Sequence, residues 1–321
     1  MTLVYLLMIV GFSILLIKST EIVTDSLKRL AEITKVGKFA ITSLLLAFAT
    51  SVPELVVGVT AALEGRPSLA LGAVLGSNIA DISLVIGGAA LIGGSFSVAG
   101  EFLRIDVFSV FLAGVMPLML LMDNVLSRVD GLILLFVYGM YNYGLIRKRV
   151  DRGPGSGKLL KRMFMPETRN KLNRWMAWLF LGAAMLVFSA DMIVKSGVAL
   201  ATGLNIPVFL IGLFLVAVGT SLPELSFEIK AIRQKQAGMA LGDLFGSVVA
   251  NSTLILGIVA LINPIKLAGG LNAYLLAAAV FGMMFCLFWF FVRSKKKLER
   301  WEGLVLVMGY LLFALAEWLK K

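Results

Sequence analysis

Two prolines lie in the middle of long apolar segments, and each is followed directly by a glutamate. These pairs are Pro53 with Glu54 and Pro223 with Glu224. Proline has no N–H and crowds the carbonyl four residues before it, so a helix opens there and backbone oxygens lose their usual partners. Within a membrane such a break is tolerated only where protein or a polar cavity satisfies these groups. Both segments are therefore predicted to be broken helices with a carboxylate at the break.

Other oxygen-bearing side chains lie within a turn of these breaks or in the segment that follows each. Three carboxyl groups and one amide are expected to converge: Glu54, Asp81, Glu224 and Asn251. Hydroxyl groups extend the set: Thr50, Ser51, Ser77, Thr220, Ser221 and Ser247. All are hard oxygen ligands, of which Ca²⁺ takes six to eight. The chain has no histidine and one cysteine, which disfavours zinc, copper and iron.

The charge of this cluster suggests a mechanism. Three carboxylates would supply about three negative charges, enough for one Ca²⁺ or for up to three Na⁺ on overlapping oxygens. If the same ligands serve both ions, the ions compete, and competition at a site open to one side at a time gives antiport. An intramembrane carboxylate is costly and indicates function by default. The alternative from the residues alone is a set of neutral, hydrogen-bonded structural carboxyls.

The chain repeats itself at an offset of 170 residues. Seven of the eleven residues in 45–55 and ten of the twenty-two in 71–92 are identical to their counterparts in the second half. Between residues 147 and 174, a basic stretch divides ten apolar segments into five and five. Because five is odd, the second half must enter the membrane from the opposite side. The sequence thus predicts an inverted repeat, which is typical of transporters.

The elements that position these groups are predicted to be membrane helices. The chain is 59% hydrophobic and 15% charged, with a mean hydropathy of +0.94, far from a soluble domain. We expect an all-α membrane protein with ten transmembrane helices in two inverted five-helix repeats, broken at the midplane. The ten predicted segments are residues 3–22, 39–63, 68–93, 102–122, 130–146, 175–195, 206–230, 238–262, 272–292 and 301–319. The first repeat is predicted to span residues 1–146 and the second 175–321, and a cytoplasmic linker, 147–174, joins them.

Loop charges predict the orientation. With both termini outside, 23 lysines and arginines fall in inward loops and six in outward loops or the tail. Positively charged loops stay on the cytoplasmic side. We therefore expect a multi-pass protein of the cell membrane with both termini outside and the central loop cytoplasmic. Residues 153–158 of that loop look like a phosphate loop but lack its required glycine and hydroxyl positions, so a flexible linker is favoured.

At these motifs the sequence resembles the cation/calcium antiporter superfamily, in particular its sodium/calcium exchanger branch of prokaryotic type. The motifs that carry the resemblance are residues 49–54 with 72–81, and 219–224 with 242–251. The resemblance implies that Glu54 and Glu224 bind calcium together with Thr50 and Thr220. It also implies flanking sodium sites, with Asp81 and Asn251 lining the middle. The flanking sites would use Ser51, Ser77, Ser221, Ser247 and the carbonyls of Ala47 and Ala217. The first and sixth helices would slide to switch access.

Some residues depart from the pattern of that branch. Asp81 and Asn251 exchange the places that the acid and amide take in the familiar archaeal exchanger. In the second half Asp243 replaces a more usual asparagine, and Glu228 stands one turn after Glu224, where the first half has Gly58. Glu228 would carry a proton, bind a further cation or pair with a nearby base, Lys230 or Arg233. The driving ion is thus left open between Na⁺ and H⁺.

Other functions fit the sequence less well. A channel would need a continuous pore, and a sensor would bind ions without moving them. An intramembrane aspartyl protease needs two apposed aspartates, but the repeat places Asp81 opposite Asn251, so no enzyme activity is expected. No cofactor or nucleic acid is implied, and the expected partners are the ions and the lipid bilayer. The acids at segment ends are expected to be exposed: Asp123, Asp130, Glu302 and Glu317.

Overall fold

The computed structural model describes residues 2–34, 51–98, 106–149, 166–267 and 272–319, and these are predominantly helical. The elements of the first half are α1 (Thr2–Thr34), α3 (Val52–Leu63), α4 (Pro67–Ala80), η1 (Asp81–Val85), α5 (Ile86–Gly93), β1 (Phe96–Ser97), α7 (Asp106–Leu120), η2 (Leu121–Asp123), β2 (Val125–Leu126) and α8 (Arg128–Arg149).

The described part of the second half is also mainly helical. Its elements are α10 (Pro166–Leu204), α11 (Val208–Leu210), η4 (Ile211–Val216), α12 (Ala217–Thr220), α13 (Leu222–Arg233), α14 (Ala237–Val249), η5 (Ala250–Ile255), α15 (Leu256–Ile262), β3 (Ile265–Lys266), α16 (Asn272–Lys295), β4 (Lys297–Leu298) and α17 (Arg300–Leu319).

Six helices among the described residues are long and apolar enough to cross a membrane. Three of them are the single helices α1, α10 and α16. The other three each combine several elements, namely α4 to α5, α11 to α13, and α14 to α15. The helices α3 and α7 are apolar but shorter. The apolar span Thr2–Val23 of α1 agrees with the predicted segment 3–22, although the helix itself continues to Thr34. The span Asn173–Leu204 of α10 extends beyond the predicted segment 175–195. The predicted linker, 147–174, is helical at both of its ends, because α8 ends at Arg149 and α10 begins at Pro166.

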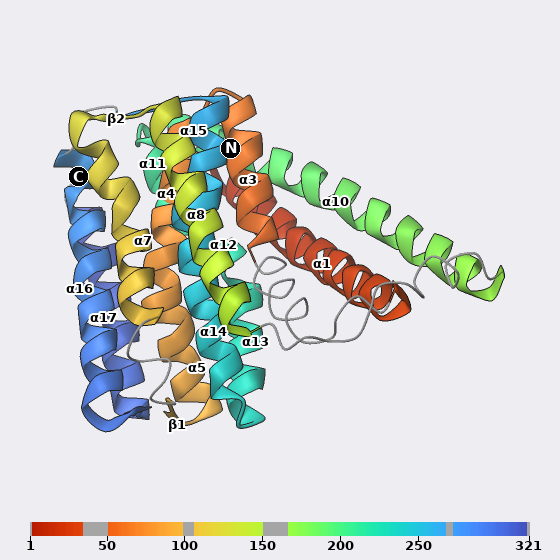
Figure 1. Cartoon of the computed structure of the whole chain (residues 1–321). Helices are drawn as coiled ribbons and strands as arrows, with labels where there is room; N and C mark the ends of the chain where they lie inside the picture. Colours follow the sequence, from red (N-terminus) through yellow and green to blue (C-terminus); the bar gives the residue numbers. More distant parts are fainter. Residues whose placement is uncertain (1, 35–50, 99–105, 150–165, 268–271, 320–321) are drawn as a thin grey trace.

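Figure 1 shows α1 and α10 as a long slanted pair beside an upright bundle of the other helices, and these two helices contact each other along their length. The bundle has α4, η1 and α5 at its centre. In the most apolar 18-residue stretch of this central segment, 94% of the residues are buried, compared with 22% for α1 and 33% for α10. The central segment is therefore surrounded by protein, whereas the long pair presents most of its surface outward.

Both predicted proline breaks coincide with the start of a new helix. Only the second can be followed on both sides within the described residues. The helix α12 ends at Thr220, and Ser221, with ψ near 1°, precedes the new helix α13. In the first half Ser51 has the same backbone geometry, with ψ near 2°, and α3 starts after it. The proline occupies the second position of each new helix, where its missing N–H costs nothing.

The structure also contains π-helical turns that the sequence analysis did not predict. The segment η1 begins at Asp81 and η5 contains Asn251, so each π turn coincides with a residue of the predicted site. A third π segment, η4, leads into the break at Ser221. π turns are uncommon and occur frequently at functional sites.

Glycines allow the helices at the centre to touch through their backbones. A Cβ added at Gly72 or Gly76 of α4 would collide with backbone carbonyls of the segment 209–213. At Gly87 of α5 it would lie 2.7 Å from the carbonyl oxygen of Gly303 in α17. At Gly131 of α8 it would lie 2.8 Å from the carbonyl oxygen of Gly257 in α15. Such close approach is typical of membrane helix interfaces.

Two short antiparallel strand pairs join the halves at their loops. One pairs Phe96 of β1 with Leu298 of β4, and the other pairs Val125 of β2 with Lys266 of β3. Thus the end of α5 lies beside the start of α17, and the end of α15 lies beside the start of α8. In both cases the two helices run in opposite directions.

Charged side chains of the helices form salt pairs, with Lys18 2.8 Å from Glu21 and Lys195 2.9 Å from Asp191. The expected exposure of Glu302 and Glu317 is wrong, because both are at most 5% exposed. The Glu302 carboxylate accepts the Glu299 N–H at 2.8 Å and thus satisfies a backbone donor at the start of α17.

Candidate functional site

The two breaks carry the two glutamates into the interior. Glu54 and Glu224 each lie in the first turn of the helix after the break, in α3 and α13, and each is at most 4% exposed. A carboxylate in the first turn also faces the positive end of the helix dipole. The break thus opens the backbone and places an acid against it.

Hydroxyl groups from the two halves meet beside Glu54. The Ser77 and Thr220 hydroxyl oxygens lie 3.4 Å apart, although the residues are 143 positions apart in the sequence. The Thr220 hydroxyl donates to the Ala217 carbonyl at 3.1 Å and interacts with the Glu54 carboxyl. The Ala217 carbonyl also accepts the Ser221 N–H at 3.0 Å. Thr220 therefore links its own helix break to an acid of the other half.

The predicted middle pair is also buried. Asp81 is 2% exposed and Asn251 is 1% exposed. The Asp81 carboxyl lies near Ser221 of the second break and within electrostatic reach of Glu54 and Glu224. The π turns place the residues of this pair at the points where α4 and α14 change their winding.

The structure brings two further acids into the interior. Glu228 is 1% exposed and Asp243 is 3% exposed, and they lie within electrostatic reach of each other and of Asp81. The first half has Gly58 and Ala73 at the equivalent positions. Among the described residues no ion pair joins Glu228 to Lys230 or Arg233. This placement favours a role near the acids of the site over pairing with a base.

Several buried oxygens of this cluster accept or donate no hydrogen bond within the described part of the chain. They belong to Ser51, Glu54, Asp81, Ser221, Glu224, Glu228, Ser247 and Asn251. Leaving a buried polar group unpaired costs about 1–3 kcal/mol, and more for a charged one. A site that binds and releases cations needs such unpaired oxygens close together, because they become the ligands of the ion.

The acids are spread out rather than gathered at one point. Within the described ranges no three acidic or cysteine side chains are placed to hold one metal ion. An ion here would therefore combine few carboxylates with hydroxyl, amide and backbone oxygens, a mixture that Ca²⁺ accepts. Two predicted ligands, Thr50 and the Ala47 carbonyl, lie outside the described residues.

Comparison with known proteins identifies the family. The chain matches the profile of the family described as sodium/calcium exchanger protein over residues 4–147 and again over 174–319. The chain belongs to this family. The fold is similar to that of the sodium-calcium exchanger NCX_Mj, with a TM-score of 0.66 and 24% identity over 97% of this chain and 99% of that chain.

Among the relatives of this chain, the inner membrane protein YrbG of Escherichia coli K12 is 31% identical over 86% of this chain and 85% of its own length. The sodium/calcium exchanger MaX1 of Methanosarcina acetivorans is 27% identical over 96% of this chain and 97% of its own length. The resemblance drawn from the motifs is thereby confirmed at the level of the family.

Some polar contacts near the candidate site were not predicted. The Asn78 side chain donates to the Ser252 hydroxyl at 2.7 Å, which links α4 to η5. Ser83 and Thr253, each two positions after the middle residue of its half, donate to the carbonyls of Ile79 and Val249. Such back-bonding bends a helix. A hydroxyl at the same place in both repeats was the signal available in the sequence.

Proposed function

We propose that the protein exchanges Ca²⁺ for Na⁺ across the cell membrane by alternating access. The ligands would be Glu54, Glu224, Thr50, Thr220, Ser51, Ser221, Ser77, Ser247, Asp81, Asn251 and the carbonyls of Ala47 and Ala217. The contact between Ser77 and Thr220, with Glu54 beside it, is the observation that carries this proposal. It supports one shared site made from both halves. NCX_Mj and MaX1, which are named sodium/calcium exchangers, support the choice of ions.

The charge of the interior supports cation binding. Five buried acids lie within electrostatic reach of at least one other: Glu54, Asp81, Glu224, Glu228 and Asp243. An uncompensated buried charge costs several kcal/mol. Positive charge must therefore accompany these groups, as metal cations or as protons. Because two kinds of cation can fill the same place in turn, exchange follows from mutual exclusion.

The packing supports two inverted repeats. Several contacts between the halves have a counterpart when the halves are exchanged, as α5 with α17 matches α15 with α8, and β1 with β4 matches β3 with β2. The family profile matches once on each side of the linker. The start of α1 and the end of α17 both lie in the upper part of Figure 1, which suits an even number of spans. We therefore propose two repeats, residues 1–146 and 175–321, with ten membrane spans in total. Both termini would lie outside, and the linker, 147–174, would be cytoplasmic.

The long helix pair is suited to move. The helices α1 and α10 contact each other extensively and lie at the edge of the bundle. A Cβ at Gly219, beside the second break, would lie 2.7 Å from the Ser13 hydroxyl of α1. Sliding of α1 and α10 would therefore pass directly over the break and open it to one side or the other.

A proton-coupled exchange of calcium is the second candidate. Glu228 and Asp243 favour it, because they add two acids where the first repeat has none. In this alternative Glu228 would carry the proton that returns.

The test is calcium uptake into vesicles that contain the purified protein. One set has an outward sodium gradient at equal pH, and the other has an outward proton gradient without sodium. Uptake in the first set alone supports the sodium exchange, and uptake in the second set alone supports proton exchange. No uptake in either set, with the protein folded and oriented, would contradict antiport of calcium.

A further inference from the structure

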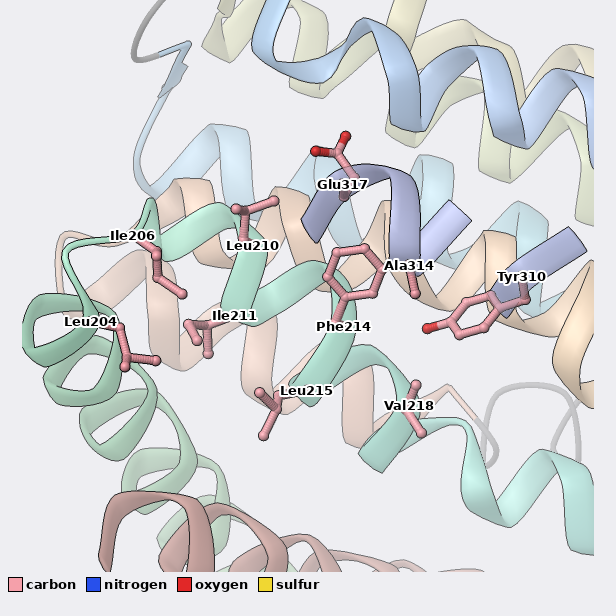
Figure 2. Close-up of a pocket in the computed structure, with 10 residues that line it drawn as sticks. All are labelled: Leu204, Ile206, Leu210, Ile211, Phe214, Leu215, Val218, Tyr310, Ala314 and Glu317. Atoms are coloured by element: carbon pink, nitrogen blue, oxygen red, sulfur yellow. The ribbon is translucent and has the colours of Figure 1, made fainter. Parts of the chain in front are cut away.

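Tyr310 of α17 has a buried hydroxyl for which the described part of the chain offers no hydrogen-bond partner. The residue is 5% exposed. Its ring lines a cavity of about 360 Å³ between α17 and the segment 204–218, and Figure 2 shows the hydroxyl directed into that cavity near Phe214 and Val218. The other lining groups are almost all apolar, so the cavity gives the hydroxyl space but little to bind.

The packing of α17 places Tyr310 at the depth of Asp81. The helices α5 and α17 are antiparallel, because β1 pairs with β4 at their ends, and they touch at Gly87 and Gly303. Asp81 precedes Gly87 by six residues, and Tyr310 follows Gly303 by seven. At 1.5 Å per residue both lie about 10 Å from the contact, on the same side of it. In agreement, α17 packs on η1, and Asp81 is within electrostatic reach of the hydroxyl.

The other repeat provides an internal comparison. The helix α8 packs on η5, and Gly131 meets Gly257 as Gly303 meets Gly87. By the same spacing Tyr138 is the counterpart of Tyr310, and it lies at the depth of Asn251. The tyrosine is therefore present in both repeats, but only one of the two faces a carboxylate.

The surroundings of the two tyrosines also differ. Tyr138 is half-buried, and Asn142, one turn later, donates to its backbone carbonyl at 2.8 Å. In α17 the residue at the place of Asn142 is Ala314, which lines the cavity beside Tyr310. The smaller side chain leaves room for the Tyr310 ring to turn.

We propose that Tyr310 is a positioning residue for Asp81, and that its hydroxyl donates to the Asp81 carboxylate when no cation is bound there. The cavity offers the hydroxyl a second direction, the one drawn in Figure 2, which it would take when a cation binds at Asp81. The tyrosine then stabilises the empty site and speeds release of the ion. This inference rests on the proposed function, since it needs Asp81 to belong to the cation site.

The test measures equilibrium binding of ⁴⁵Ca²⁺ to the purified protein, together with the maximal rate of calcium uptake in vesicles. Tyr310→Phe removes only the hydroxyl. A hydrogen bond to a charged group is strong enough that its loss should lower the half-saturating calcium concentration on the order of tenfold. The maximal rate should fall at the same time. Tyr138→Phe is the matched control, and it should leave both values unchanged.

A second pair of variants separates positioning from packing. In an Asp81→Asn background, Tyr310→Phe should have no further effect, because coupling through one partner vanishes when that partner is gone. An equal shift in both backgrounds, or unchanged calcium affinity of Tyr310→Phe, would overturn the inference while leaving the exchange intact. If the wild-type protein binds and transports no calcium, the proposed function fails first and the inference with it.

Discussion

Replacing Glu54 with glutamine tests the proposed site most sharply. Glu54→Gln keeps the shape and one oxygen ligand but removes one negative charge from the buried cluster. Glu54 is 4% exposed and interacts with Thr220 of the other half. We therefore expect the variant to fold and to lose calcium transport.

The magnitude follows from Coulomb's law. A unit charge and a divalent ion at about 4 Å attract each other by roughly 8 kcal/mol at an effective dielectric constant of about 20. If half of this is offset by the easier desolvation of a neutral amide, about 4 kcal/mol remains. Calcium affinity should thus fall by roughly a thousandfold.

The same change should stabilise the protein in the absence of calcium. Glu54 repels the other buried acids, Asp81, Glu224 and Asp243, and one of its oxygens has no hydrogen-bond partner among the described residues. Glutamine carries no charge, so the repulsion from these acids and the cost of burying a charged carboxylate are both removed. Loss of function and gain of stability in one variant distinguish a binding acid from a structural one.

Both effects are measurable on one preparation. Calcium uptake in vesicles gives the transport activity, and thermal unfolding in detergent with and without calcium gives the stability. Glu64→Gln, an exposed acid that follows the same helix α3, is the control and should change neither. Near-normal uptake by Glu54→Gln, or a lower unfolding temperature without calcium, would refute the reasoning.

Three other predictions follow from the structure. Gly76→Ala should lower the free energy of unfolding by about 1–3 kcal/mol, since its Cβ meets the backbone of Leu213; Gly139→Ala, in open space, is the control in thermal unfolding. Asp81→Asn should keep its unfolding temperature within a few degrees of wild type but transport fewer calcium ions per driving ion in flux-ratio measurements, and an unfolded variant would instead favour a structural role. Lys297, Lys295 and Trp301 hold the pKa of Glu299 at about 2, below its usual value of 4.5. These partners therefore stabilise the folded protein fully above pH 4.5 and less as the pH falls toward 2. Glu299→Gln should lower the unfolding temperature most above pH 4.5, and its difference from wild type should shrink toward pH 2.

The breaks and the placement of the glutamates could be predicted from the sequence. Proline acts locally, through its missing N–H and its ring, so Pro53 and Pro223 are sufficient to locate the changes at Ser51 and Ser221. The repeat then indicates which residues of the two halves correspond. These inferences need only short-range rules and comparison within one chain.

The π turns and the contacts between the halves could not be predicted in this way. A π turn is stabilised by its surroundings as much as by its own residues, and at η1 and η5 the signal is only a hydroxyl that bonds back to a carbonyl. The bond between Asn78 and Ser252 depends on how α4 crosses η5. The burial of Glu302 was missed because its partner is a backbone N–H, which every residue has.

The placement of Glu228 shows a similar limit. Its sequence neighbours Lys230 and Arg233 suggested an ion pair, but the helix α13 turns its side chain inward, toward Asp243 of α14. Spacing along one helix defines the face on which a residue lies, whereas packing decides which face is buried.

The central claim is tested most directly by calcium uptake into vesicles under an outward sodium gradient, at equal pH on both sides. The account predicts uptake that depends on the sodium gradient, is lost in Glu54→Gln and Glu224→Gln, and stops when the gradient is collapsed. Equal uptake with and without the gradient, or undiminished uptake by both variants, would contradict exchange at this site.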